Sequence, residues 1–308
     1  MPGKINPIGL AVIGCGNIAK SHIKAIQQIE DLRLIATVDI DEERAKKYAE
    51  AYGASRYYTS HVAALEDPEV DAVSICLPHS FHAQVAVDAA QRGKHIITEK
   101  PMATSLNDAK RMVQAAEMRG VTLMVEQTLR FRECNIRAKE MIREGVIGEP
   151  RHAIRRRLSY SKTTPVTWAN KPEIAGGWVL YGFGSHEVDI ALWHLGSPAR
   201  RVYAQGIVND PYWNDYDEIS VHMELADGAI VTVLMSLNCQ QHSWDSTIIG
   251  TKGSITIREA RDITVGRRVI QTSLESLGGI KAALREFASA LIEGREPEAS
   301  GRDVLKTM

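Results

Sequence analysis

The sequence of 308 residues predicts an α/β fold in two domains. In the first ~130 residues, short apolar runs alternate with segments of helical periodicity, which is typical of a parallel sheet with helices on both faces. A glycine-rich turn joins the first apolar run to the first helical segment. After Gly148 the period becomes two residues, which predicts an α+β domain with an open, mostly antiparallel sheet. We therefore expect domains at residues 1–127 and 128–308.

The first domain is expected to contain repeated βαβ units. Apolar runs predict strands over residues 8–13, 32–38, 72–77, 95–98 and 123–125. Helical periodicity predicts helices over residues 18–29, 42–52, 81–91 and 106–119. Because parallel strands need crossover connections of about this length, the alternation predicts one parallel sheet.

The second domain shows a clear hairpin. Apolar residues alternate with polar ones over 219–225 and again over 231–237, and Asp227-Gly228 between them predicts the turn. Residues 189–195 predict the end of a buried helix, and residues 281–293 predict an amphipathic helix. The basic run 155–157 lies in a strand-like stretch, where we expect an exposed edge or a subunit contact.

Composition excludes several classes of protein. Lys plus Arg is 37 and Asp plus Glu is 38, so the charge balance predicts no nucleic-acid partner. No stretch reaches the ~20 apolar residues of a membrane span, and residues 1–7 contain no apolar signal core. The four cysteines are far apart in the sequence and form no CxxC pair, which favours reduced thiols. We expect a cytoplasmic protein.

The glycine-rich turn has the pattern GxGxxA after a predicted strand and before a predicted helix. Gly14 allows the tight turn, and Gly16 lets backbone N–H groups approach a pyrophosphate. The helix that follows directs its amino end at the anion. This context predicts a dinucleotide-binding Rossmann domain, whose loop contacts come from Gly14, Cys15, Gly16, Asn17 and Ile18.

Asp39 ends the second predicted strand, 20 residues after Ala19. A carboxylate at this place accepts hydrogen bonds from the ribose hydroxyls and repels a 2′-phosphate, which favours NAD over NADP. Arg44 is near enough in sequence to reduce that repulsion. A simple role for Asp39 in capping the next helix is compatible with cofactor binding.

Two further stretches are informative. Residues 75–102 are ICLPHSFHAQVAVDAAQRGKHIITEKPM, and residues 176–189 are GGWVLYGFGSHEVD. Together with the glycine loop they resemble the Gfo/Idh/MocA oxidoreductase family, which includes glucose–fructose oxidoreductase and inositol dehydrogenase. The resemblance extends from about Ile8 to Arg302, and the Glu-Lys-Pro motif at 99–101 is its most specific part.

The resemblance implies where the cofactor lies. Leu77, Pro78 and His82 match the segment on the nicotinamide side, and Glu99 and Lys100 would lie beside the nicotinamide ribose. Gln127 matches the cofactor-side segment that leads into the second domain. In this family the second domain often forms the subunit interface, so we expect a homodimer or homotetramer.

Two residues are candidates for the chemistry. Lys100 would bind the reacting oxygen, and His186 would transfer the proton, since the unperturbed pKa of imidazole lies near neutrality. The family pattern has Asp where this chain has Gly182, so the partner of His186 is open: Glu187, Asp189 or Tyr181 replaces it, His186 acts unassisted, or Lys100 carries the proton alone.

The expected substrate is a sugar, inositol or related polyol. Tyr160, Trp168 and Tyr181 are candidate substrate contacts, because aromatic faces suit sugar rings. The ten histidines show no metal-binding pattern, so we expect no metal. Two alternatives to a dehydrogenase or reductase are an NAD-dependent glycoside hydrolase that recycles its cofactor and a non-catalytic nucleotide-binding sensor.

Overall fold

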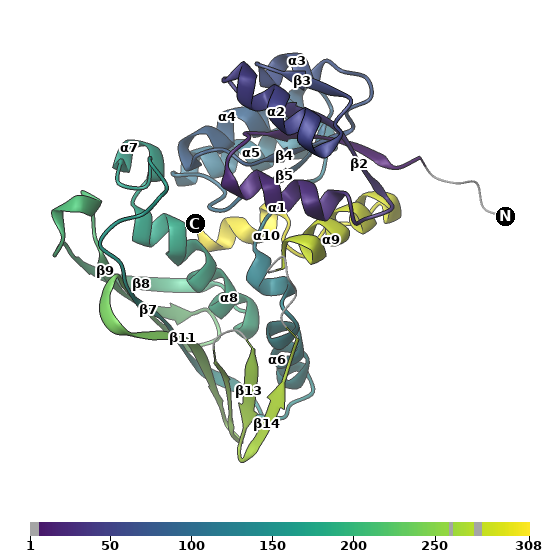
Figure 1. Ribbon diagram of the computed structural model, residues 1–308. Helices are drawn as coiled ribbons and strands as arrows, with labels where there is room; N and C mark the ends of the chain where they lie inside the picture. Colours follow the sequence, from purple (N-terminus) through teal and green to yellow (C-terminus); the bar gives the residue numbers. More distant parts are fainter. Residues whose placement is uncertain (1–5, 259–260, 274–278) are drawn as a thin grey trace. The chain divides into compact units, whose positions relative to one another are not determined.

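The computed structural model describes residues 6–258, 261–273 and 279–308. The chain separates into two compact units (Figure 1). The first unit contains Met1–Glu126, Gly279–Lys306 and Met308, and the second contains Gln127–Gly278 and Thr307. The N-terminal segment in which no signal core is expected includes residues 1–5, which lie outside the described residues.

The first unit contains a six-stranded parallel sheet in the order β3-β2-β1-β4-β5-β6. This confirms the predicted doubly wound sheet. Its strands are β1 (Ile8–Ile13), β2 (Leu32–Val38), β3 (Arg56–Tyr58), β4 (Ala72–Ile75), β5 (His95–Thr98) and β6 (Leu123–Val125). Its crossover helices are α1 (Asn17–Ile26), α2 (Glu42–Tyr52), α3 (His61–Leu65), α4 (His82–Gln91) and α5 (Leu106–Arg119).

Local signals explain most of these boundaries. Asp41 caps α2 and Ser105 caps α5, each by accepting a hydrogen bond from a backbone N–H three residues later. Gly53 and Gly120 end the same helices in the left-handed conformation. The sequence analysis did not predict β3 and α3, because a strand of three residues and a helix of five are too short for a periodic pattern.

The C-terminal segment packs with the first unit. Helix α9 (Ile280–Glu293) lies beside α1, and α10 (Gly301–Val304) packs against α5 and β6 (Figure 1). The Val125 amide donates to the Ala299 carbonyl at 2.9 Å, which extends the sheet edge. This differs from the expected second domain of residues 128–308, because the apolar face of α9 is buried against a helix from the opposite end of the sequence.

The second unit contains an eight-stranded sheet in the order β14-β13-β12-β11-β7-β10-β9-β8. Neighbouring strands are antiparallel except β7 and β10, which are parallel. The predicted mostly antiparallel sheet is therefore confirmed. Its strands are β7 (Pro150–Tyr160), β8 (Ala199–Ile207), β9 (Glu218–Leu225), β10 (Ile230–Ser236), β11 (Asn238–Gly250), β12 (Ser254–Arg258), β13 (Asp262–Val265) and β14 (Arg268–Gln271).

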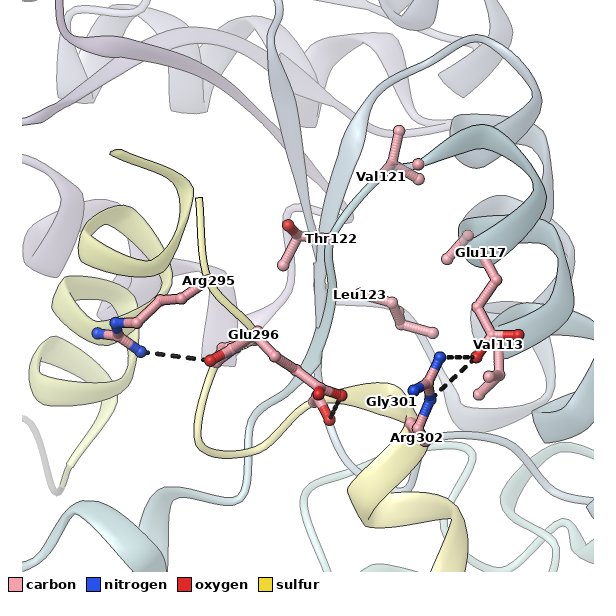
Figure 2. Close-up of a pocket in the computed structure, with 13 residues that line it drawn as sticks. Val113, Glu117, Val121, Thr122, Leu123, Arg295, Glu296, Gly301 and Arg302 are labelled. Atoms are coloured by element: carbon pink, nitrogen blue, oxygen red, sulfur yellow. Dashed lines mark hydrogen bonds and ion pairs between the residues drawn. The ribbon is translucent and has the colours of Figure 1, made fainter. Parts of the chain in front are cut away.

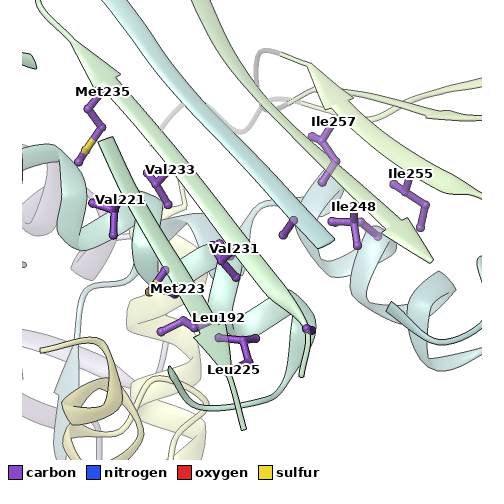
Figure 3. Packing of buried hydrophobic residues seen from close by; sticks show 14 of the residues in the cluster. Leu192, Val221, Met223, Leu225, Val231, Val233, Met235, Ile248, Ile255 and Ile257 are labelled. Atoms are coloured by element: carbon purple, nitrogen blue, oxygen red, sulfur yellow. The ribbon is translucent and has the colours of Figure 1, made fainter. Parts of the chain in front are cut away.

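One face of this sheet forms a hydrophobic core. Helices α6 (Glu133–Arg143) and α8 (Ser185–Leu195) and the π-helical turn η3 (Trp178–Gly184) cover it. In the predicted hairpin, Val221 pairs with Val233 and Ile219 with Met235, so each pair lies on one face. Figure 3 shows Val221, Val233 and Met235 in the hydrophobic cluster. The short helix α7 (Pro172–Ala175) precedes η3.

The basic run on β7 does not lie at a sheet edge, so the expectation of an exposed edge was wrong, whereas a subunit contact stays a prediction. Strand β7 lies between β11 and β10. Arg155 is 1% exposed and faces α8, whereas Arg156 faces the opposite side and pairs with Asp245. Alternation along a strand sends neighbouring side chains to opposite faces, so the run divides between two environments.

None of the helices among the described residues has both the length and the apolar character needed to cross a bilayer.

Candidate functional site

The glycine loop forms a tight turn at the amino end of α1. Gly14 has φ +95°, and a Cβ there would lie 2.5 Å from the Cys76 carbonyl oxygen, so this position requires glycine. Gly16 is the N-cap residue of α1 and no side chain caps the helix. A Cβ at Gly16 would meet no atom within 4 Å. The loop therefore has an uncapped helix end beside open space, which fits a pyrophosphate.

Asp39 connects this loop to the end of β2. Its Oδ2 accepts a hydrogen bond from the Cys15 amide at 2.9 Å, and its Oδ1 accepts one from the Asp41 amide at 3.0 Å. The Arg44 guanidinium lies 3.2 Å from Oδ1. The carboxylate thus holds the loop in place, and Arg44 offsets part of its negative charge.

His82 links the ends of two neighbouring strands. The ring is fully buried, with Nδ1 at 2.8 Å from the Pro101 carbonyl oxygen and Nε2 at 2.8 Å from the Leu77 carbonyl oxygen. It therefore fixes the segment after β4 to the Glu-Lys-Pro segment after β5. Burial lowers the pKa of His82, although both carbonyl groups oppose that shift. The geometry gives His82 a positioning role beside the half-buried Pro78 and Lys100.

A buried ionic network lies behind the Glu-Lys-Pro segment. His22 Nδ1 lies 2.8 Å from Ser74 Oγ, and His22 Nε2 lies 3.0 Å from Glu99 Oε1. Glu99 Oε2 accepts a hydrogen bond from the Lys100 amide at 3.1 Å. Glu126 Oε1 is 3.9 Å from His22 Nδ1. We name His22, Glu99 and Glu126 the histidine–glutamate cluster.

Burial and charge set the protonation of this cluster. Burial raises the pKa of Glu126 to about 8, because its carboxyl is fully enclosed and neither oxygen has a hydrogen-bond partner among the described residues. Burial also acts on Glu99, but the hydrogen bond and charge of His22 outweigh it and lower the pKa of Glu99. Cys76, Glu99 and Glu126 together raise the pKa of His22 despite its burial. The arrangement favours an ionised Glu99 paired with a cationic His22, beside a neutral Glu126.

In the second unit, Gln127 orients His186. Gln127 Oε1 lies 2.9 Å from His186 Nδ1, while Gln127 Nε2 donates to the Ser185 carbonyl at 3.3 Å. Because the amide oxygen is an acceptor, the contact requires a proton on Nδ1 and so favours the Nδ1–H tautomer over the Nε2–H tautomer. Nε2 is then the basic nitrogen of the ring.

The other candidate partners of His186 have different contacts. Asp189 accepts two hydrogen bonds from Arg130, at 2.6 and 2.8 Å, and Glu187 pairs with Arg155. Gln127 was predicted as a cofactor-side residue, and its contact with His186 was not predicted. The only signal was that Gln127 follows a strand end, which does not identify a partner 59 residues away.

Gly182 creates space for an aromatic ring. A Cβ at this position would lie 3.1 Å from the Trp178 ring. Trp178 packs edge-on against both Trp168 and Phe183, with ring centroids 5.7 Å apart in each pair. The position at which the resemblance implies an Asp is therefore a glycine packed against the Trp178 indole.

The candidate substrate residues are in different surroundings. Trp168 belongs to this aromatic group, and Tyr181 lies half-buried in η3. Tyr160 is 53% exposed at the end of β7, with the Lys162 ammonium 5.5 Å from its ring centroid.

A cavity of about 230 Å³ lies at the opposite end of the parallel sheet from the glycine loop. Figure 2 shows it between the start of β6 and the C-terminal segment. Its charged groups are paired with each other or with nearby side chains: Arg302 with Glu117 at 2.6 Å, and Arg295 with Glu286 at 2.6 Å. Parallel α/β sheets bind ligands beyond the carboxyl ends of their strands, so this cavity is not the cofactor site. Within the described ranges, no group of three or more His, Cys, Asp or Glu side chains could hold a metal ion.

Comparisons with known proteins agree with this geometry. Residues 8–127 match a family described as "Oxidoreductase family, NAD-binding Rossmann fold", and residues 136–256 match "GFO/IDH/MocA C-terminal domain". The chain is 30% identical over 259 residues to scyllo-inositol 2-dehydrogenase (NAD(+)) of Bacillus subtilis, covering 82% of this chain and 74% of the relative. It is 27% identical over 310 residues to myo-inositol 2-dehydrogenase of Thermotoga maritima, covering 96% and 91%. The crystal structure of aldose-aldose oxidoreductase from Caulobacter crescentus with glycerol has a TM-score of 0.89 and 26% identity, covering 98% and 94%.

Proposed function

This chain belongs to the Gfo/Idh/MocA oxidoreductase family, and we propose that it transfers a hydride between NAD and a secondary hydroxyl or ketone of a sugar, inositol or related polyol. The observation that carries the proposal is the Gln127–His186 contact, which prepares Nε2 as a base. The inositol and aldose enzymes among its relatives support the substrate class.

The residues of the first unit fit the cofactor. Gly14, Cys15, Gly16, Asn17 and Ile18 would hold the pyrophosphate at the amino end of α1. Asp39 would accept hydrogen bonds from the adenosine ribose, and its charge favours NAD over NADP. Leu77, Pro78, Glu99 and Lys100 would hold the nicotinamide half, and His82 keeps their two segments together.

Each catalytic side chain has a separate task. Bound NAD supplies the hydride acceptor. The Lys100 ammonium binds the substrate oxygen and stabilises the negative charge that develops there. His186 Nε2 takes the hydroxyl proton during oxidation and returns it during reduction. A prepared base of this kind favours catalysis over nucleotide sensing.

The second sheet supplies a surface for self-association. The face opposite the hydrophobic core has exposed apolar groups, including Ile230 at 48% and Ile249 at 39% exposure. The edge strand β8 adds Val202 and Tyr203, which are 61% and 65% exposed. Because a sheet face of this kind needs covering, we propose a homodimer or homotetramer. Light scattering at micromolar concentration tests this, and a monomer contradicts it.

The test of the activity is a paired screen that follows NADH absorbance. Cyclic polyols and sugars are compared with linear 2-hydroxy acids and amino acids. We expect turnover of rings, with NADH released in proportion to product. Turnover of linear acids alone would overturn the substrate class, and glycoside cleavage without net NADH would indicate the hydrolase.

A further inference from the structure

Three arginines of the second unit surround one indole on the core face of the sheet. Arg155 and Arg157 lie on β7, and Arg132 directly precedes α6. Their guanidinium carbons lie 5.8, 5.0 and 4.6 Å from the Trp244 ring centroid. We name Arg132, Arg155 and Arg157 the arginine cluster.

One carboxylate faces these three positive charges. Glu187 on α8 is fully buried and accepts from Arg155 Nε. Its other oxygen accepts from Trp244 Nε1 at 3.2 Å and lies 3.5 Å from Arg157 Nη1. Among the described residues no second carboxylate forms an ion pair with the cluster. One negative charge cannot balance three guanidinium groups, which keep their protons in proteins.

The unbalanced charge coincides with unsatisfied hydrogen-bond donors. Within the described part of the chain, Arg155 Nη2 and Arg132 Nε are buried without a partner. Burial and neighbouring positive charges lower the pKa of Arg132, and burial lowers that of Arg157 despite Glu187. One Arg–Glu pair would anchor α8 to the sheet at less cost, because each unpaired buried donor is destabilising. Buried donors without partners and unbalanced buried charges are concentrated at functional sites.

Arg157 connects the cluster to the aromatic group. Its side chain is 30% exposed, and its guanidinium carbon lies 4.3 Å from the Phe183 ring centroid. Phe183 packs on Trp178 beside Gly182, and Glu187 directly follows His186. The accessible edge of the cluster is therefore continuous with the aromatic surface to which η3 contributes.

We propose that Arg157 and Arg132, backed by Arg155, bind an anionic oxygen group of the substrate, a carboxylate or a phosphate. The planar guanidinium fork suits both groups. This inference rests on the proposed function and narrows it: the preferred substrate is an acidic sugar or polyol rather than a neutral one. The substrate ring packs on the aromatic group of Trp168, Trp178 and Phe183, while its anionic group pairs with Arg157.

The experiment measures binding to the full chain saturated with NAD, by calorimetry and by tryptophan fluorescence. The probes are D-glucuronate, D-glucose 6-phosphate and inorganic phosphate, with D-glucose as the neutral match. Wild type is compared with Arg157→Gln and Arg157→Lys. Arg156→Gln is the control, because it removes the adjacent charge on the other face of β7. Thermal unfolding checks that each variant is folded.

We expect at least one anionic probe to bind about 10- to 100-fold more tightly than D-glucose. Arg157→Gln should remove this difference, Arg157→Lys should restore part of it, and Arg156→Gln should keep it. A carboxylate source is indicated by D-glucuronate alone, and a phosphate source by the phosphates alone. Equal binding of anionic and neutral probes, or equal losses in Arg157→Gln and Arg156→Gln, overturns the inference.

The same variants separate this inference from the proposed function. If wild type oxidises neutral polyols but shows no preference for anionic probes, and Arg157→Gln oxidises the same polyols equally well, the anion subsite is overturned. The proposed dehydrogenase activity is then retained. Anion binding that depends on Arg157, without hydride transfer to any polyol, retains the subsite and contradicts the dehydrogenase.

Discussion

The histidine–glutamate cluster and the arginine cluster are both buried, and each contains more charge of one sign than the other. In the first, two carboxyl groups face one imidazole, and Glu126 can resolve the excess by keeping its proton. In the second, three guanidinium groups face one carboxylate and none can lose its proton at ordinary pH. The first cluster can balance its charge within the protein through the proton on Glu126, whereas we propose that the second binds an external anion. We therefore infer different roles for them: the histidine–glutamate cluster supports the catalytic segment, and the arginine cluster recognises the substrate.

The largest effect on activity is expected at Lys100, whose backbone amide donates a hydrogen bond to Glu99 of the histidine–glutamate cluster. Lys100→Met should lower kcat/KM by about 10²- to 10⁴-fold, because it removes the ammonium from the developing charge. NAD binding, measured by fluorescence titration, should change little. Lys110→Met on the exposed side of α5 is the control. Near-wild-type turnover by Lys100→Met would exclude the assigned role.

A smaller effect is expected at the orienting contact of the second unit. Gln127→Leu should lower kcat by about 10- to 100-fold, because His186 loses the group that selects its tautomer. Gln127→Glu should recover activity and move the acid limb of the pH–rate profile to higher pH, since a carboxylate favours the imidazolium. An unchanged profile in Gln127→Glu would show that His186 is not the titrating base.

Substitution of Asp39 should have a weaker effect, which falls on the choice between NAD and NADP. Asp39→Asn removes the charge but keeps an oxygen for the Cys15 amide. We expect the preference for NAD over NADP to fall about 10-fold, because Arg44 is then no longer paired with a carboxylate at position 39. Asp39→Ser, which shortens the side chain, should also weaken binding of both cofactors. Greater efficiency with NADP(H) than with NAD(H) in wild type would contradict the assignment.

The smallest effect on turnover is expected at Glu126, where the effect on stability is large. The pKa of Glu126 is raised from 4.5 to about 8 in the folded protein. The contribution of Glu126 to the free energy of unfolding is therefore fully present below pH 4.5 and is lost as the pH rises through about 8. Over this range the free energy of unfolding should fall by up to about 1.4 kcal/mol per pH unit. Glu126→Gln should remove this slope from the free energy of unfolding.

Chemical denaturation across that pH range tests the point at Glu126. Glu140→Gln, on the exposed side of α6, is the control because its side chain is 48% exposed and pairs only with the exposed Arg137 in the described structure. The slopes of other groups are common to all three proteins, so the difference from wild type isolates Glu126. Parallel curves for wild type and Glu126→Gln would show that the folded carboxyl is ionised near neutral pH.

The sequence predicted the first unit better than the second for physical reasons. Strand β2 and helix α2 match their predicted bounds, because a buried parallel strand and a capped helix carry local signals. Strand β7 was misplaced at an edge, because its neighbours β10 and β11 follow it by about 70 residues or more. Helix α9 was recognised, but its packing against α1 leaves no pattern in either segment.

The residues of the candidate site also differ in how well the sequence predicts them. The glycine loop, Asp39 and Lys100 belong to contiguous motifs, so the sequence identified them. The contacts of His22 with Glu99 and of Gln127 with His186 join residues 77 and 59 positions apart. Single-sequence reasoning has no means to find such pairs, because neither partner has an unusual local context.

The central claim is that Lys100 acts in the same way on every substrate, whereas Arg157 of the second unit selects the acidic ones. The most direct measurement is kcat/KM for the best acidic and the best neutral polyol, in wild type, Lys100→Met and Arg157→Gln. The account predicts that Lys100→Met lowers both values by the same factor, whereas Arg157→Gln lowers only the value for the acid. An equal loss for both substrates in Arg157→Gln, or a selective loss in Lys100→Met, would contradict it.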